Sequence, residues 1–185
     1  MEYNPMFRDL RADEIEVRVA QAKLNGVSLL LYKDARVDQV VLDETVGPMN
    51  WQRSHGRENA NCTVSIWDEK KQSWVSKEDT GTESNTEKEK GLASDSFKRA
   101  CFNWGIGREL YTAPFIWVPA DKLTQLKGEG DRWKCFDTFT VAKIIIENKR
   151  IMAIGIRNDK SGKLCFVWQD AEWMQRKNVE KNGTK

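Results

Sequence analysis

The residues best suited to bind a ligand lie between Gly91 and Tyr111. Apolar residues at helical spacing predict a helix with one side on a core: Ala93, Phe97, Ala100, Cys101 and Trp104. At about 100° per residue, Lys98, Arg99 and Phe102 face away from that core. Arginine can bind a phosphate through two hydrogen bonds, lysine adds a mobile charge, and an aromatic ring can stack on a base. The spacing therefore suggests a binding site for a single nucleic-acid strand.

The same spacing has a plainer interpretation. Charged residues on an exposed helix face commonly do no more than solvate it. Asp95 precedes Lys98 by three residues and Arg99 by four, which is the separation of helical ion pairs. Spacing alone favours this interpretation over a binding site.

A longer string around these residues resembles a known family. Ser94-Asp95-Ser96-Phe97-Lys98-Arg99-Ala100 is similar to the helix motif of the Rad-fifty-two type annealing proteins, and closer still to their phage relatives of the Sak type. The ending of residues 104–111, Trp-Gly-Ile-Gly-Arg-Glu-Leu-Tyr, recurs in those relatives. A second similar block runs from Leu31 to Val37 and continues to Gly47-Pro48-Met49-Asn50-Trp51. The resemblance covers residues 10 to 112.

The resemblance implies a function that composition does not show. Members of the family bind single-stranded DNA and anneal complementary strands without ATP in recombination and double-strand break repair, as rings or helical homo-oligomers. Their motif lysine and arginine correspond to Lys98 and Arg99. A single-strand binding protein or an exonuclease is an expected further partner, and no cofactor is expected. The implied fold is α+β, with an antiparallel β-β-β meander packed on a long helix. The sequence pattern, beyond the reach of the resemblance, adds C-terminal antiparallel strands.

Further DNA contacts are predicted around this motif. Arg18 corresponds to an arginine in the family's first helix, and Arg36 lies in the upstream block. A basic residue that often follows the motif arginine by three positions is Phe102 here. Stacking on Phe102, or a cation at Lys90 or Arg108, is therefore expected to complete the site.

Periodicity predicts the elements that position this helix. A first helix is expected from Asp13 to Leu24, followed by a buried strand from Val27 to Tyr32. Asp34 should cap a second helix that Gly47-Pro48 ends, with Val37, Val40 and Val41 on its core side. From Trp51 to Asp79 the pattern has period two, which predicts an antiparallel meander with one solvated face. The charged stretch from Lys77 to Lys90 is expected to be an exposed loop.

Three strands are expected after a short segment at Phe115 to Pro119 and a short polar helix. They run from Phe139 to Glu147, Ile151 to Arg157 and Leu164 to Gln169, with turns at Asn148-Lys149 and Asp159 to Gly162. Residues 1–175 are expected to form one domain, with family-like residues 10–112 followed by the C-terminal strands within 115–170. The tail from Arg176 to Lys185 has little to bury and is expected to be disordered.

Composition limits the other possibilities. The 30 basic and 28 acidic residues leave a net charge of +2, so any basic site must be local. The four cysteines are 30 or more residues apart, which argues against a thiolate metal site and for reduced core residues. His55 is the single histidine. Residues 1–6 show no secretory signal and no apolar run is long enough to span a membrane, so a cytoplasmic location, in a bacterium or a phage-infected host, is expected.

Two alternative functions stay open. Asp137 precedes Glu147-Asn148-Lys149 at a distance tolerable for a Mg²⁺-dependent nuclease of the PD-(D/E)-x-K kind. That motif should lie within a strand, whereas Glu147 to Arg150 lies between two apolar runs, where a hairpin turn is expected. The third possibility is a non-enzymatic interaction module that uses the C-terminal strands to bind a partner.

Overall fold

The computed structural model describes residues 6–82 and 88–183, which form two compact units. Unit 1 combines residues up to Asp9 with Asp34–Arg108, and unit 2 combines Leu10–Lys33 with the chain from Glu109 onward. Both contain helices and antiparallel sheets, so the predicted α+β class is confirmed. The single domain expected from the sequence stays a prediction, and the contacts of the structure group into these two units.

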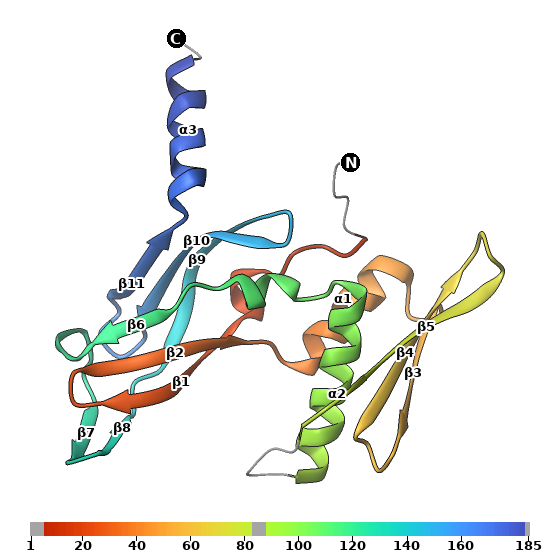
Figure 1. Cartoon of the computed structure of the whole chain (residues 1–185), viewed down its shortest axis with the longest axis horizontal. Coiled ribbons are helices and arrows are strands. Elements are labelled where there is room, and N and C mark those ends of the chain that lie inside the picture. The colour runs from red at the N-terminus through yellow and green to blue at the C-terminus, as the bar shows by residue number, and fades with distance from the viewer. Residues whose placement is uncertain (1–5, 83–87, 184–185) are drawn as a thin grey trace. The chain divides into compact units, whose positions relative to one another are not determined.

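Unit 1 is built from two helices and a three-stranded antiparallel sheet within its described residues. In chain order these are α1 (Ala35–Val46), β3 (Trp51–Gly56), β4 (Asn61–Asp68), β5 (Ser73–Thr80) and α2 (Lys88–Trp104). The strands follow the order β3-β4-β5, and α2 runs along the sheet (Figure 1). The segment predicted to have period two forms antiparallel strands, but β5 extends to Thr80, so the predicted loop from Lys77 begins inside a strand.

The core of unit 1 lies between β4 and α2. Alternate residues of β4 point to the helix, because side chains on a strand alternate between its two faces. They are Cys62, Val64 and Ile66, and they pack with Phe97, Ala100 and Cys101, all with side chains at most 3% exposed. Helix α1 adds Val41 and Leu42 to this core. Val40, predicted on the core side, is instead 44% exposed, because the buried stripe of α1 lies one residue further along.

Unit 2 is organised around a six-stranded antiparallel sheet with the order β11-β10-β9-β1-β2-β6. Its strands are β1 (Glu16–Lys23), β2 (Gly26–Tyr32), β6 (Ile116–Pro119), β9 (Phe139–Glu147), β10 (Arg150–Asn158) and β11 (Leu164–Gln169). The two edge strands, β6 and β11, contact each other, so the sheet is nearly closed like a barrel. Two further strands form a separate hairpin, β7 (Leu126–Glu129) and β8 (Arg132–Cys135). The remaining described elements are the helix α3 (Ala171–Gly183) and the short 3-10 turns η1 (Ala12–Glu14), η2 (Arg108–Thr112) and η3 (Ala120–Lys122).

The predicted first helix, from Asp13 to Leu24, is wrong, and Arg18 therefore lies on a strand. After the turn η1, this segment forms β1, which pairs with β2 so that Val17 faces Leu31 and Val19 faces Leu29. Apolar residues at helical spacing misled the prediction, although β-branched valines at alternate positions also suit a strand. Pairing with the buried strand β2 decided between the two, because it satisfies the backbone groups of both strands.

The C-terminal strands agree closely with prediction. The strands β9, β10 and β11 are those predicted, to within one residue at each end. Asn148 and Lys149 both have positive φ, 52° and 61°, as a two-residue hairpin turn requires. The hairpin interpretation of this segment is therefore confirmed.

The predicted disordered tail is wrong for the residues that the structure describes, because α3 continues to Gly183. The Asp170 side chain accepts a hydrogen bond from the Trp173 backbone N–H at 2.9 Å and so caps the helix. Trp173 packs against Met152 and Ala153, and its indole donates to Glu147 at 2.8 Å. A capped and anchored first turn extends a helix into polar sequence, which composition alone does not predict.

The cysteines are thiols, as predicted, and three of them, Cys62, Cys101 and Cys165, are buried. Within residues 6–82 and 88–183, no helix combines the length and hydrophobicity needed to cross a membrane.

Candidate nucleic-acid interface

Helix α2 positions the predicted DNA-binding residues. Phe97, Ala100 and Cys101 fix the buried side of the helix, and Lys98, Arg99 and Phe102 are half-buried on its flank. The helix ends at Gly105, whose φ of +100° lies in the region that favours glycine. The Gly105 N–H donates to the Phe102 carbonyl at 2.9 Å and closes the last turn. The side chains of the motif are thus held on a rigid element of unit 1.

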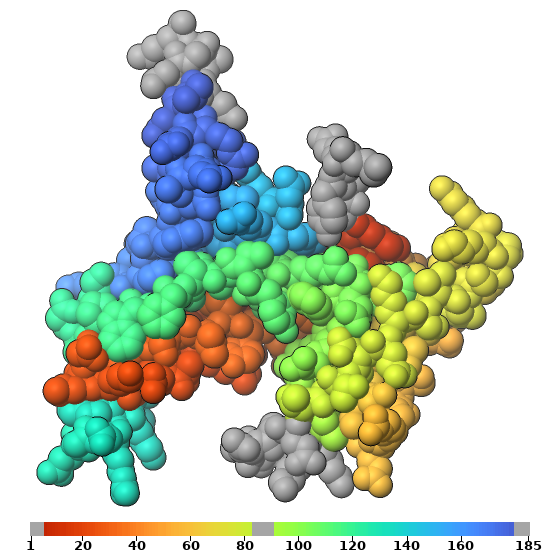
Figure 2. Space-filling model, in the orientation of Figure 1, coloured from red at the N-terminus to blue at the C-terminus, as the bar shows by residue number. Residues whose placement is uncertain are grey.

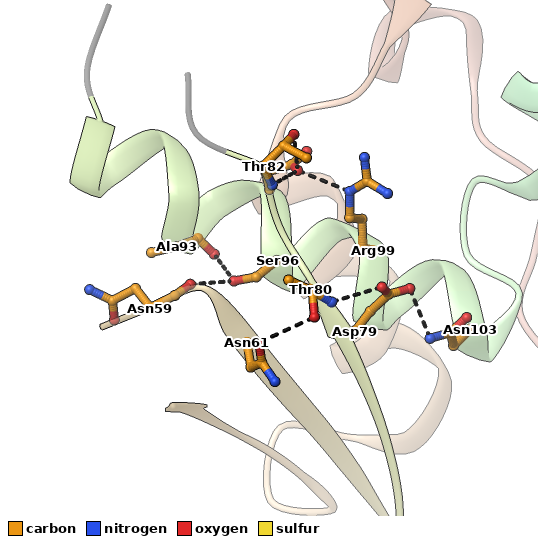
Figure 3. A network of polar contacts seen from close by, with 10 residues as sticks. Asn59, Asn61, Asp79, Thr80, Thr82, Ala93, Ser96, Arg99 and Asn103 are labelled. Atoms are coloured by element: carbon orange, nitrogen blue, oxygen red, sulfur yellow. Dashed lines mark hydrogen bonds and ion pairs between the residues drawn. The ribbon is translucent and has the colours of Figure 1, made fainter. Parts of the chain in front are cut away.

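Arg99 is held in place by an acidic residue one turn earlier. Its Nε donates to Asp95 Oδ2 at 3.0 Å, which is the ion pair that sequence spacing predicted. The same carboxylate oxygen accepts hydrogen bonds from the Thr82 backbone N–H at 2.9 Å and the Thr82 hydroxyl at 3.2 Å (Figure 3). Arg99 is therefore oriented by a carboxylate that also fastens the chain just after β5.

The Asp95 carboxyl has a pKa below its ordinary value. Partial burial raises this pKa, but the hydrogen bonds from Thr82 and the interaction with Arg99 together outweigh that effect. Asp95 is therefore ionised at neutral pH, and its ion pair with Arg99 persists there.

Lys98 differs from Arg99 in its surroundings. Its side chain is half-buried, and it forms no hydrogen bond or ion pair within the part of the chain that the structure describes. A lysine held beside an oriented arginine gives the flank of α2 two adjacent cations, of which only Arg99 is paired with a described carboxylate. Two such groups suit adjacent phosphates of one strand.

Arg108 and Phe102, predicted as alternative contacts, lie together at the end of α2. Arg108 donates to the carbonyls of Phe102 and Asn103, both at 2.9 Å, and so adds a second donor to each of these carbonyls in the last turn of the helix. The guanidinium carbon of Arg108 also lies 5.6 Å from the centre of the Phe102 ring. Both side chains therefore have a role in ending the helix.

The remaining predicted contacts are more scattered. Arg36 is exposed in the first turn of α1, where its backbone N–H donates to Asp34 at 2.7 Å. The side chain of Lys90 lies outside the described residues. Arg18 belongs to unit 2, where its guanidinium pairs with Glu16 and lies 5.1 Å from the Tyr32 ring centre. Unit 1 thus holds Lys98, Arg99, Phe102 and Arg108 on or beside one helix end.

A polar network that the sequence analysis missed joins α2 to the sheet (Figure 3). The buried hydroxyl of Ser96 donates to the Asn59 carbonyl at 3.0 Å, and Asn103 donates to Asp79 on β5 at 3.1 Å. Within the sheet, the Thr80 hydroxyl donates to Asn61 at 3.2 Å. The signal for the first contact was present, because Ser96 is a polar residue four positions before the core residue Ala100 on the same stripe of the helix.

Two cations also pack on core aromatic rings of unit 1. The guanidinium of Arg53 lies 4.6 Å from the Phe97 ring centre, and Lys77 Nζ lies 4.5 Å from that of Trp104. These contacts hold β3 and β5 against α2 and are worth about 0.5–2 kcal/mol each.

The residues of the nuclease alternative are each held by other partners. Asp137 accepts hydrogen bonds from the Thr124 backbone N–H at 2.7 Å and from Asn158 at 3.0 Å. Glu147 pairs with α3, and Lys149 lies 3.8 Å from Glu109. Among the described residues, no three acidic, histidine or cysteine side chains converge as metal ligands. The geometry gives the nuclease interpretation no support.

No family model, curated protein or solved structure matches this chain. The functional conclusion therefore depends on the residues themselves.

Proposed function

We propose that this protein binds single-stranded DNA through α2 and anneals complementary strands without ATP, as a ring or helical homo-oligomer acting in recombination and break repair. The observation that carries the proposal is the adjacent pair of cations on one rigid helix, Lys98 without a described partner and Arg99 oriented by Asp95. They stand in a string that resembles the motif of annealing proteins. The packing of α2 on β3, β4 and β5 is compatible with the β-β-β-α core of that family.

The mechanism is physical. Contacts from Lys98 and Arg99 to the sugar-phosphate backbone hold a strand in an ordered path, and such contacts position nucleic acid without reading its sequence. Ordering the strand in advance removes part of the entropy cost of pairing, while the base edges stay free to meet a complementary strand.

Oligomerisation would multiply this effect. One pair of cations per subunit is a weak site, but repeating it around a closed ring makes each short pairing attempt part of a multivalent one. Because binding energy drives every step, no nucleotide is consumed. The chain accordingly has no G-x-x-x-x-G-K-[ST] loop.

The test is an annealing assay with complementary oligonucleotides and no nucleotide. The double variant Lys98→Ala, Arg99→Ala should bind single-stranded DNA at least about tenfold more weakly, because each charge-assisted contact contributes about 1.5–3 kcal/mol. The salt dependence of binding should also fall by about 0.7 log unit for each phosphate that the variant no longer neutralises. Annealing above the spontaneous rate should disappear in the same variant.

The control is Lys160→Ala with Lys163→Ala, which removes the same charge from the exposed turn between β10 and β11. This control should anneal as the unaltered protein does. Equal losses in both double variants would indicate bulk charge and contradict the proposed site. Strand cutting that requires Mg²⁺ and Glu147 would replace the proposal by the nuclease interpretation.

A further inference from the structure

The outer face of β1, β2 and β6 in unit 2 exposes aromatic and apolar side chains. On β2 and β6 the inward residues are almost fully buried: Val27, Leu29, Ile116 and Val118. The alternate residues point outward: Leu30, Tyr32, Phe115 and Trp117. Leu30 is 49% exposed, Tyr32 38% and Phe115 77%. These four residues are called the aromatic face, and Figure 2 shows the segments that carry it, with β1 and β2 in orange-red and β6 in green.

Two rings of this face lie almost parallel. The ring planes of Phe115 and Trp117 differ by 16°, and their centres are 6.5 Å apart. Gly26, paired with the end of β6, makes this arrangement possible, since a Cβ there would lie only 2.8 Å from Cζ2 of Trp117. The indole is therefore seated on the sheet, and Phe115 stands beside it with most of its surface in solvent.

A cation lies at the other side of the same face. Arg18 on β1 is the cross-strand neighbour of Leu30, and its guanidinium packs 5.1 Å from the Tyr32 ring centre. Glu16 pairs with Arg18 through Nε at 3.0 Å, and Lys23 at the end of β1 is exposed. The described side chains of β1 thus carry two cations, Arg18 and Lys23, and one carboxylate, Glu16.

We infer that the aromatic face is a stacking surface for the bases of single-stranded DNA, a second contact that rests on the proposed function. Successive bases of one strand have nearly parallel planes, which matches the parallel rings of Phe115 and Trp117. A flanking cation matches the phosphate backbone of that strand. Stacking also occupies the faces of the bases and leaves their pairing edges open, as annealing requires.

The test compares two fluorescent oligonucleotides of equal length, oligo-dT and a strand of abasic residues with the same phosphate charge. The full chain should prefer oligo-dT. Phe115→Ala should weaken binding of oligo-dT about 5-fold or more, because base–aromatic stacking contributes about 1–3 kcal/mol per base, and should leave the abasic strand unaffected. Phe115→Leu should show the same loss, since it keeps an apolar side chain but has no ring. Phe136→Ala, which removes a ring 54% exposed between β8 and β9, is the matched control.

Phe115 is largely in solvent, so these variants should fold, and a circular dichroism melt checks this. Unchanged affinity for oligo-dT in both Phe115 variants overturns the inference. Full binding by Phe115→Leu overturns it too, since the contact would then be merely apolar, as with a protein partner. Dissociation of an oligomer by Phe115→Ala would assign the face to a second copy of the chain.

The same experiment separates this inference from the annealing proposal. Annealing that is lost in Lys98→Ala with Arg99→Ala but unaffected by Phe115→Ala leaves the function standing and refutes the stacking surface. Binding of oligo-dT that depends on the Phe115 ring, without any annealing, supports the stacking surface and refutes the annealing function. A full chain that binds neither strand refutes both.

Discussion

Replacing Lys149 should destabilise unit 2 and should not change any cutting of DNA. Lys149 Nζ lies 3.8 Å from Glu109 Oε2, and the two side chains are 4% and 0% exposed. The other carboxylate oxygen of Glu109 accepts a hydrogen bond from the Leu10 backbone N–H at 2.7 Å. Lys149→Met keeps an unbranched side chain of nearly the same length but leaves the Glu109 charge buried without its cation.

The expected loss follows from Coulomb's law. Two unit charges 3.8 Å apart attract by about 4 kcal/mol at an effective dielectric constant of about 20. Breaking a buried ion pair by removing one partner typically costs about 3–5 kcal/mol, which agrees. The free energy of unfolding should therefore fall by about 4 kcal/mol. In the double variant Glu109→Gln, Lys149→Met, most of it should return, because the amide oxygen still accepts from Leu10 and no charge is left buried.

Urea unfolding at pH 7, followed by tryptophan fluorescence, measures these changes, with Lys160→Met in an exposed turn as the control. A decrease of less than about 1 kcal/mol in the free energy of unfolding of Lys149→Met would refute the reasoning. The ion pair would then make no net contribution to stability. A double variant as unstable as the single one would assign the effect to packing instead of charge. The nuclease interpretation makes the opposite prediction, namely unchanged stability and abolished Mg²⁺-dependent cutting.

Two smaller predictions concern unit 1. Asp95→Asn should lower the free energy of unfolding at pH 7, because it weakens the contacts to Thr82 and Arg99. The pKa of Asp95 is held below its ordinary 3.8, so this loss of stability should persist above pH 4 and shrink as the pH falls through the lowered pKa. Urea unfolding at pH 7 and pH 3 measures both values. An unchanged difference at pH 3 would exclude the carboxylate as its source. Burial, the largest cause, raises the pKa of the Cys62 thiol to about 11, so little of the reactive thiolate is present at pH 8. Iodoacetamide at pH 8 should therefore leave Cys62 unmodified in the folded protein and alkylate it in urea, which peptide mass mapping detects. Native labelling of Cys62 ahead of the half-buried Cys135 would contradict its placement.

Much of the candidate site was predictable because its signals are local. The buried side of α2 follows from the spacing of Phe97 and Ala100, and the ion pair between Asp95 and Arg99 follows from their separation by four residues. The role of Arg108 in ending the helix was not predictable in this way. A guanidinium reaches carbonyls five and six residues earlier only once the chain has turned at Gly105 and Gly107.

The sequence by itself determined those elements whose pattern has one physical solution. Period two over β4 and the apolar runs around Asn148-Lys149 permit only strands joined by tight turns, and both are found. Tertiary structure decided the elements for which two local solutions compete. The segment of β1 satisfies helical and strand spacing alike, and its pairing with β2 selected the strand. Helix α3 is anchored by its residue Trp173, which packs against Met152 and Ala153 of β10. These residues are far apart in sequence, so no local pattern encodes the contact.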